Sequence, residues 1–219
     1  MNKQTTAVAE DKDFLTEFLA KSVRLCKQNR KQVLVTLVVV ILLITGISCY
    51  INHCKKVTEN SWAAYYTAQT TLMREGQEAG FAKLDALVAQ YKGTPAAEYA
   101  QLLKGDVLYS QENFAQAANV YKALANSSNE TVRTVAALSQ AAALQAAKDY
   151  SGSISVAKDF IEKNSKSFAL PQAYLTLALS QELAGQKDQA VASYKYLLEK
   201  HTKTYFGTFA KDKLSQLQK

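Results

Sequence analysis

The segment that most constrains this chain is a long stretch without charge near its N-terminus. Between Lys31 and Lys55 the sequence contains no Asp, Glu, Lys or Arg, and residues 33–51 are strongly apolar. A helix rises about 1.5 Å per residue, so this apolar part would extend over about 28 Å, close to the thickness of the hydrocarbon core of a bilayer. The pattern predicts a single transmembrane helix. It divides the chain into three predicted parts: a leading segment (1–31), the span (32–54) and a folded domain (55–219).

The charges on either side of the stretch predict its orientation. Five basic residues precede it closely: Lys21, Arg24, Lys27, Arg30 and Lys31. Only Lys55 and Lys56 follow it within a similar distance. Because the cytoplasmic flanks of membrane helices carry an excess of Lys and Arg, we expect the N-terminus in the cytoplasm and the large C-terminal domain outside it.

Two other interpretations of the apolar stretch stay open at this stage. A cleaved signal peptide has a short basic leader and an apolar core of about 7–15 residues, whereas this leader is long and contains acidic residues such as Glu10 and Asp13. A lipoprotein signal would end at Cys49, which follows a small residue, but Gly46 stands where a leucine-like residue is usual. We therefore expect a permanent anchor, with lipidation of Cys49 as the main alternative.

The leading segment is predicted to contain an amphipathic helix over Asp13–Gln28. Its large apolar residues fall on one helical face: Phe14, Leu15, Phe18, Leu19 and Val23. Such a helix would lie on the inner membrane surface, where anionic lipids attract its basic residues. The docking of a cytoplasmic partner is the alternative.

The rest of the chain has the composition of a helical protein. Only two prolines and eight glycines occur in 219 residues, too few for the many turns of a sandwich or barrel. Neither His53 nor His201 stands in a catalytic pattern, and there is no glycine-rich phosphate loop. The polar cluster Cys49–Cys54 lacks the paired spacing of zinc sites. We predict no enzymatic activity, no metal and no cofactor; the net charge of +7, spread along the chain, predicts no nucleic-acid partner.

From Ser61 onward apolar residues recur with the helical period, and the pattern itself repeats. Three stretches align on a short turn between two helices: residues 102–125, 138–162 and 175–200. The turns are Glu112–Phe114, Lys148–Tyr150 and Gly185–Lys187. Each turn is followed after three residues by a small side chain and after four more by a second fixed position: Ala117 and Tyr121, Ser153 and Ala157, Ala190 and Tyr194. Corresponding small sites on the first helices are Gly105, Ala141 and Ala178.

Small residues at fixed positions let two helices approach closely, and a larger residue one turn later fills the adjacent gap. This organisation resembles the tetratricopeptide repeat (TPR) family, whose helix–turn–helix units have about 34 residues. The resemblance implies an all-α fold, with a single N-terminal transmembrane helix followed by a TPR-like right-handed α-solenoid of antiparallel helix pairs. The units here are two or three residues longer. Lys104 and Lys187 stand where a leucine and an aromatic residue are usual.

Further helices are predicted on both sides of the three aligned units. An earlier pair would have Trp62, Tyr65, Tyr66 and Gln69 on its first helix, which ends near Gly76, and Phe81, Leu84, Leu87, Val88 and Tyr91 on its second. Pro95 and Pro171 suit the starts of helices. The tail Thr204–Lys219 is predicted to form a capping helix with Lys211 and Lys213 facing water.

The first helices of TPR pairs line a concave groove. By repeat position the groove candidates are mostly apolar or aromatic: Tyr99, Leu102, Asp106, Tyr109, Leu138, Ala142, Gln145, Leu175, Leu179 and Glu182. TPR domains that clamp a peptide carboxylate use Lys, Asn and Arg at such positions, whereas Leu102, Leu138 and Leu175 stand here. We expect no carboxylate clamp and instead contact with an apolar helix or an unfolded segment. The alternative is that several of these residues form core between repeats.

The layout as a whole is similar to the YfgM-like family, which are ancillary subunits of the Sec translocon in the bacterial inner membrane. The similarity covers nearly the full length and rests on that layout, on Lys83–Leu124 and on Ala210–Leu217. It implies a non-enzymatic, single-pass protein whose repeat domain lies in the periplasm. The implied partners are Sec translocon channel subunits, a membrane-anchored periplasmic chaperone and exported proteins. The rivals are an envelope scaffold or lipoprotein-like TPR protein for outer-membrane assembly or cell division, and a subunit supporting cell-wall synthesis.

Overall fold

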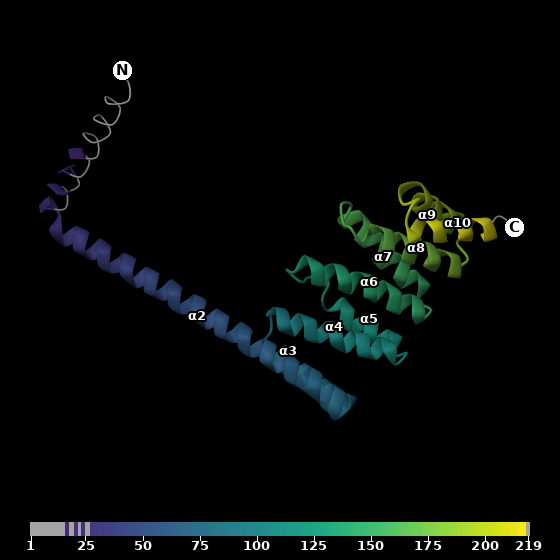
Figure 1. Ribbon diagram of the computed structural model, residues 1–219, viewed down its shortest axis with the longest axis horizontal. Coiled ribbons are helices and arrows are strands. Elements are labelled where there is room, and N and C mark those ends of the chain that lie inside the picture. Colours follow the sequence, from purple (N-terminus) through teal and green to yellow (C-terminus); the bar gives the residue numbers. More distant parts are fainter. Residues whose placement is uncertain (1–15, 18–19, 22, 25–26, 218–219) are drawn as a thin grey trace, which may run out of the picture. The chain divides into compact units, whose positions relative to one another are not determined.

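The computed structural model describes residues 16–17, 20–21, 23–24 and 27–217, and the regular secondary structure within them is entirely helical (Figure 1). The helix predicted over Asp13–Gln28 falls largely on residues outside this set. The helices are α2 (Arg30–Arg74), α3 (Gln77–Gln90), α4 (Pro95–Ser110), α5 (Phe114–Lys122), α6 (Glu130–Ala146), α7 (Tyr150–Lys163), α8 (Leu170–Leu183), α9 (Lys187–Lys200) and α10 (Tyr205–Leu217). The predicted all-α class is confirmed.

The chain divides into two compact units, Met1–Lys56 and Val57–Lys219, and α2 contributes residues to both. The division lies close to the limit predicted between residues 54 and 55. The two units differ in what they contain. The first contains the apolar stretch, and the second contains the helix pairs.

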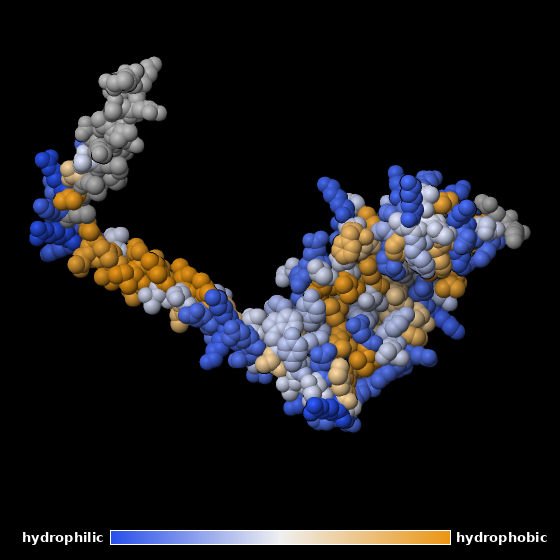
Figure 2. All heavy atoms as spheres, in the orientation of Figure 1, coloured by the Kyte–Doolittle hydropathy of each residue, from blue (hydrophilic) through white to orange (hydrophobic). Residues whose placement is uncertain are grey.

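The apolar stretch forms the N-terminal part of α2, and Figure 2 shows it as a continuous band of hydrophobic side chains. Within the described residues, α2 is the one helix long and apolar enough to cross a membrane, and none of its most apolar window is buried. Both threonine hydroxyls of the apolar stretch are satisfied inside the helix: Thr36 donates to the carbonyl of Gln32 at 2.9 Å, and Thr45 donates to that of Ile41 at 2.8 Å. Internal satisfaction of this kind is what a lipid environment requires.

The second unit is a row of helix pairs. The part of α2 that follows Val57 pairs with α3, and the later pairs are α4 with α5, α6 with α7, and α8 with α9. The first helices also contact one another, since α4 packs on α6 and α6 on α8, and α8 in turn packs on the last helix, α10. This nearest-neighbour stacking is the architecture of an α-solenoid.

Both prolines lie at helix starts, as predicted. Pro95 begins α4, and the hydroxyl of Thr94 accepts a hydrogen bond from the backbone N–H of Ala97 at 3.4 Å. Pro171 occupies the first turn of α8. A proline is tolerated there because its missing N–H has no partner within the helix in any case.

The turn inside each aligned pair has one backbone geometry. Glu112, Lys148 and Gly185 occupy the same repeat position, and all have positive φ, at 63°, 65° and 75°. The next residue in each turn returns a hydrogen bond to the carbonyl five residues earlier; for Asn113 and Leu108 the distance is 2.9 Å. A left-handed residue followed by such a bond is the Schellman helix ending. The second helix then begins at the last residue of each aligned turn: Phe114, Tyr150 and Lys187.

The small residues lie where paired helices approach most closely. Gly105 in α4 faces Tyr121 in α5 so tightly that a Cβ atom on Gly105 would lie 2.5 Å from the tyrosine ring. The tyrosine is 2 % exposed and fills the gap predicted for it. Ala117, Ser153 and Ala190 are fully buried. The predicted role of these repeat positions is confirmed.

The earlier pair is a fourth unit of the same repeat. Ala68, Gly80 and Leu84 stand 37 positions before Gly105, Ala117 and Tyr121 in the sequence. All three are buried, with Ala68 and Leu84 at 0 % exposure. Gly80 packs against Leu72, so the close contact between helices is present here as well. The repeat domain therefore begins within α2.

The last helix covers the end of the array. Ala210 and Leu214 are buried against Tyr194 and Leu197 of α9, as the prediction of a cap requires. The prediction that Lys213 faces water is wrong, because its side chain is only 24 % exposed and its Nζ atom lies 2.9 Å from Glu182. A position-by-position helical pattern identifies the polar side of α10, but it cannot reveal a carboxylate supplied by α8.

Candidate protein-binding surface

The candidate surface is the first-helix face, which we define as the side of the repeat domain formed by the first helices of the pairs: α2 from Val57 onward, α4, α6 and α8. Successive members of this set lie side by side, as α4 does with α6 and α6 with α8. The helical period brings side chains three, four and seven residues apart onto one side of each helix. In Figure 2 hydrophobic side chains gather in the middle of the repeat domain, over the region of α4 to α6, with hydrophilic side chains around them.

The ten predicted groove residues separate by exposure. Tyr99, Asp106 and Tyr109 are exposed. Leu138, Ala142, Gln145, Leu179 and Glu182 are half-buried. Leu102 and Leu175 are buried, at 8 % and 7 % exposure, and are not accessible to a partner.

The leucine position of the repeat belongs to the core between units. Leu102 packs in a cluster with residues of α5 and α6, and Leu175 packs with residues of α9 and α10. The equivalent Leu138 contacts the buried cluster around Phe160 and Ala173. For this position the alternative interpretation, inter-repeat core, therefore applies. An apolar residue there stabilises the stack, so its presence alone does not indicate an apolar ligand.

Gln145 holds two first helices together. Its side-chain amide donates a 2.8 Å hydrogen bond to the hydroxyl of Ser180 in α8. Ser180 also shares a 2.8 Å hydrogen bond with Ser153, whose hydroxyl donates to the carbonyl of Ala141 at 2.8 Å. Such a satisfied buried polar network fixes the register of α6, α7 and α8.

Glu182 likewise makes its polar contacts within the fold. One carboxylate oxygen pairs with Lys213 at 2.9 Å, and the other accepts a 2.7 Å hydrogen bond from the hydroxyl of Tyr194. Burial by itself raises the pKa of Glu182, but the bonds from Lys213 and Tyr194, together with the lysine's charge, lower it overall. Burial and the bond to Glu182 raise the pKa of Tyr194. This carboxylate therefore serves the terminal cap.

An aromatic cluster lies at the N-terminal end of the first-helix face. We define it as Trp62, Tyr65 and Tyr66 of α2 with Tyr99 of α4. The ring centroid of Trp62 is 5.6 Å from Tyr65, 6.3 Å from Tyr66 and 5.6 Å from Tyr99. The side chains of Tyr66 and Tyr99 are 61 % and 37 % exposed. Large aromatic rings that are ordered by one another but still accessible are the usual anchors of a protein interface.

The sequence interpretation missed two parts of this surface. Trp62 stands 37 positions before Tyr99, so extending the repeat alignment one unit back would have found it, whereas Tyr65 stands 37 positions before Leu102 and is half-buried against the cluster around Leu84 and Ala100. Val135 occupies the same position one unit after Tyr99 and is 43 % exposed. The repeat spacing of 36–37 residues was therefore sufficient to place Trp62 and Val135 at the position of Tyr99.

Asp106 provides a negative charge beside the aromatic cluster. It is exposed, and one of its oxygens accepts a 2.6 Å hydrogen bond from the hydroxyl of Tyr121. Burial, the bond to Asp106 and its charge raise the pKa of Tyr121. Burial is the main cause that raises the pKa of Tyr65, and the charges of Tyr66, Asp106 and Tyr99 raise it further. Among the described residues, no cation pairs with Asp106.

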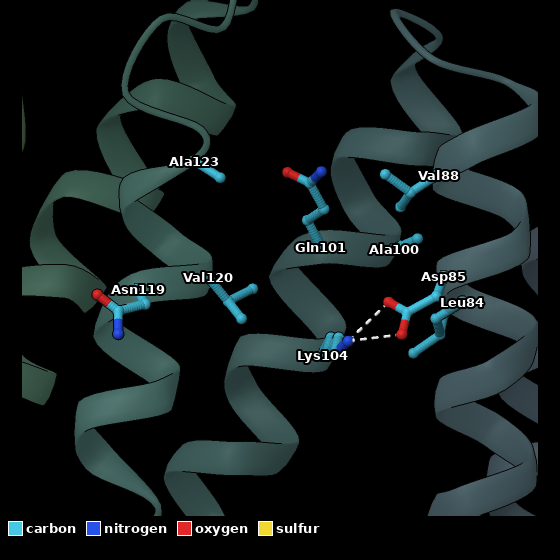
Figure 3. Close-up of a pocket in the computed structure, with 9 residues that line it drawn as sticks. All are labelled: Leu84, Asp85, Val88, Ala100, Gln101, Lys104, Asn119, Val120 and Ala123. Atoms are coloured by element: carbon cyan, nitrogen blue, oxygen red, sulfur yellow. Dashed lines mark hydrogen bonds and ion pairs between the residues drawn. The ribbon is translucent and has the colours of Figure 1, made fainter.

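A hollow of about 310 Å³ lies between α3, α4 and α5 (Figure 3). Leu84, Val88 and Val120 line it, and Lys104 stands at one side with its Nζ atom 2.6 Å from Asp85. The same ammonium group lies 5.3 Å from the ring centroid of Phe81. These contacts account for a lysine at the usual leucine position, because its stem covers apolar surface while its charge is paired.

Nothing in the described part of the chain gathers three or more His, Cys, Asp or Glu side chains in a way that could hold a metal ion. The first-helix face presents aromatic rings, the exposed carboxylate of Asp106 and apolar side chains.

A family model described as "Tetratricopeptide repeat-like domain" matches residues 24–156. Among solved structures, the TPR-like repeats of a putative kinesin light chain from Podosopora anserina and a single-residue variant of the same repeats each have a TM-score of 0.56 to this chain. They share 13 % and 12 % identity, and each match covers 73 % of this chain and 86 % or 85 % of the other. A MamA RS-1 ArsTM double mutant has a TM-score of 0.48 at 15 % identity, over 72 % of this chain and 94 % of the other. No curated protein matches the sequence.

Proposed function

Because this chain belongs to the tetratricopeptide repeat-like domain family, whose fold is an interaction scaffold, we propose that it is a non-enzymatic module that binds other proteins at a membrane. The observation that carries the proposal is the union of two features in one chain. An unburied, uncharged stretch of α2 precedes four stacked helix pairs whose first-helix face presents aromatic rings. The first feature suits an anchor, and the second suits a docking surface.

The anchor follows from the cost of leaving α2 in water. Its residues include large apolar side chains with no partner in the fold, such as Leu42 at 66 % and Ile44 at 62 % exposure. Each such side chain gains about 1.5–3 kcal/mol when it is removed from water, so a membrane is the natural environment of the stretch. The excess of basic residues before Val33 favours a cytoplasmic N-terminus. The repeat domain would then lie outside the cytoplasm.

The finer proposal is an ancillary subunit of the Sec translocon that works with periplasmic chaperones on exported proteins. It is supported by the similarity to the YfgM-like family, which has the same order of basic leader, single span and divergent repeats. In this position the first-helix face would meet polypeptide segments before they fold. Exposed apolar and aromatic residues are the features that such segments offer and that this face can bury.

A pull-down from membranes tests this function. The tagged full-length chain is extracted in a mild non-ionic detergent, and its partners are identified by mass spectrometry against a control that carries only residues 1–56. We expect the channel subunits and a membrane-anchored chaperone to be enriched with the full-length chain. Equal recovery with both proteins, or enrichment of cell-wall synthases alone, would contradict the translocon assignment.

A further inference from the structure

The aromatic cluster and Asp106 together form an electronegative surface, and no basic side chain of the described residues forms an ion pair with Asp106. The faces of aromatic rings carry negative electrostatic potential. Trp62 packs within 5.6 Å of the rings of both Tyr65 and Tyr99, and Asp106 lies two helical turns after Tyr99 on the same side of α4. That spacing corresponds to about 10 Å along the helix axis, a distance that a long side chain can bridge.

Within the repeat domain, the basic residues of α2, α4 and α6 are engaged elsewhere or distant, whereas Lys55 and Lys56 of α2 precede that domain, seven and six residues before Trp62. Lys104 is the one basic residue of α4, and it pairs with Asp85 at 2.6 Å. Arg133 is the one basic residue of α6, and it donates a 2.6 Å hydrogen bond to the carbonyl of Ser127. In the part of α2 that belongs to the repeat domain, the one basic residue is Arg74, about 18 Å along the helix from Trp62. None of these cations neutralises Asp106 in the structure.

A purely apolar partner would not account for this arrangement. Covering Asp106 with an apolar segment would remove from water a carboxylate that has the Tyr121 hydroxyl as a hydrogen-bond donor but no cation beside it, which is unfavourable. A cationic side chain avoids that cost, because it pairs with the carboxylate while its aliphatic stem lies on the rings. Aromatic rings within about 6 Å of a cation add a direct attraction, which is strongest for Trp.

We propose that Trp62, Tyr65, Tyr99 and Asp106 form a site for an arginine or lysine side chain of a bound polypeptide segment. The rings receive the stem and the cationic group, and Asp106 acts as the counter-ion. The site rests on the proposed function, since it requires that the first-helix face binds polypeptide, and it adds the chemistry by which a segment is selected. The selected segments carry a basic residue among apolar ones.

The test uses the full-length chain in an uncharged detergent and reads the fluorescence of Trp62, the only tryptophan in the sequence. Two probe peptides of Ala, Leu and Ser, with blocked ends and no aromatic residue, differ only in a central arginine or its neutral isostere citrulline. We expect the arginine peptide to bind about tenfold more tightly, the size expected of a cation–π contact with one charge-assisted hydrogen bond. Raising the salt concentration should reduce this preference.

Three variants locate the effect. Asp106→Asn should bind both peptides equally, because it keeps an acceptor for Tyr121 but removes the charge. Tyr121→Phe removes that hydrogen bond and leaves the carboxylate, so it should keep the preference for arginine. Asp212→Asn changes an exposed carboxylate on α10 and should also keep the preference.

Each alternative outcome has a definite meaning. Equal binding of both peptides to the wild-type chain would overturn the cation site and leave the binding of polypeptides intact. Retention of the preference in Asp106→Asn would overturn it as well. Binding of neither peptide would remove the site, while the pull-down from membranes judges the translocon function separately.

Discussion

The Nζ atom of Lys213 in α10 lies 2.9 Å from a carboxylate oxygen of Glu182 in α8. The other oxygen of the same carboxylate accepts the hydroxyl of Tyr194 in α9. One side chain therefore connects three helices at the C-terminal end of the array. Terminal helices of repeat proteins have a neighbour on one side only, so contacts of this kind determine whether the last helix stays folded.

Removal of the lysine should loosen the cap. We expect Lys213→Met to lower the free energy of unfolding of the repeat domain by about 1–2 kcal/mol, because it leaves a half-buried carboxylate without its cation. Urea unfolding of the full-length chain in detergent, followed by circular dichroism, measures the change. Lys211→Met is the matched control on the same helix, and its exposed side chain should matter by less than about 0.5 kcal/mol. Equal effects of the two substitutions would contradict the structural role of the ion pair.

The same carboxylate should make stability depend on pH. The pKa of Glu182 is lowered from its ordinary value of 4.5 in the folded protein. A carboxyl group with a lowered folded pKa stabilises the fold above its unfolded pKa, and this contribution is lost as the pH falls through the folded pKa. The difference in unfolding free energy between the wild-type chain and Glu182→Gln should therefore be largest near neutral pH and shrink below about pH 4. A constant difference over the acidic range would show that the group does not titrate as described.

The left-handed turn residues offer a stabilising substitution. Glu112 and Lys148 occupy positive-φ positions that the third aligned unit fills with Gly185. We expect Lys148→Gly to raise the free energy of unfolding by about 0.5–1 kcal/mol, since glycine has no Cβ to clash in this conformation. The control is Lys158→Gly in the exposed middle of α7, which should lower it by about 1 kcal/mol. Thermal unfolding of both variants gives the comparison, and destabilisation by Lys148→Gly would contradict the turn geometry.

Cys49 distinguishes an anchor from a lipoprotein. If α2 stays in the membrane uncleaved, metabolic labelling with a fatty acid should leave the protein unlabelled, and Cys49→Ser should keep the same chain length and membrane fraction. Labelling that disappears in Cys49→Ser, with a mature N-terminus at this residue, would support the lipoprotein alternative instead. Intact-mass spectrometry of the purified chain gives an independent measure.

Local features were predictable from the sequence because they depend on nearby residues. Backbone geometry determines the turns at Glu112 and Lys148 and the prolines at helix starts. Close contact between paired helices determines the small residues at fixed repeat positions. The pair formed by α2 and α3 follows the same 37-residue spacing, although the sequence analysis did not align Ala68 and Gly80 with the three later units.

Relations between units were not predictable in the same way. The repeat positions of Leu102 and Leu175 are compatible both with contact to a ligand in the groove and with burial in the core. Only the packing of neighbouring helices shows that they belong to the core. The helical pattern of α10 predicts that Lys213 faces solvent, because that pattern does not reveal that Glu182 of α8 lies beside it. The bond between Asp106 and Tyr121 joins different helices, so no helical period within one element could indicate it.

The central claim is that the first-helix face receives polypeptide partners outside the cytoplasm. Its most direct test uses the full-length chain in living cells and replaces one residue at a time with a photo-crosslinking amino acid. One variant carries it at Tyr99, in the aromatic cluster. The other carries it at Lys158, which is exposed on α7, the second helix of its pair. We predict that irradiation joins the Tyr99 position to exported proteins or to a membrane-anchored chaperone, and that the Lys158 position gives little of either product. Crosslinks from Lys158 but not from Tyr99, or from Tyr99 only to cytoplasmic proteins, would contradict the account.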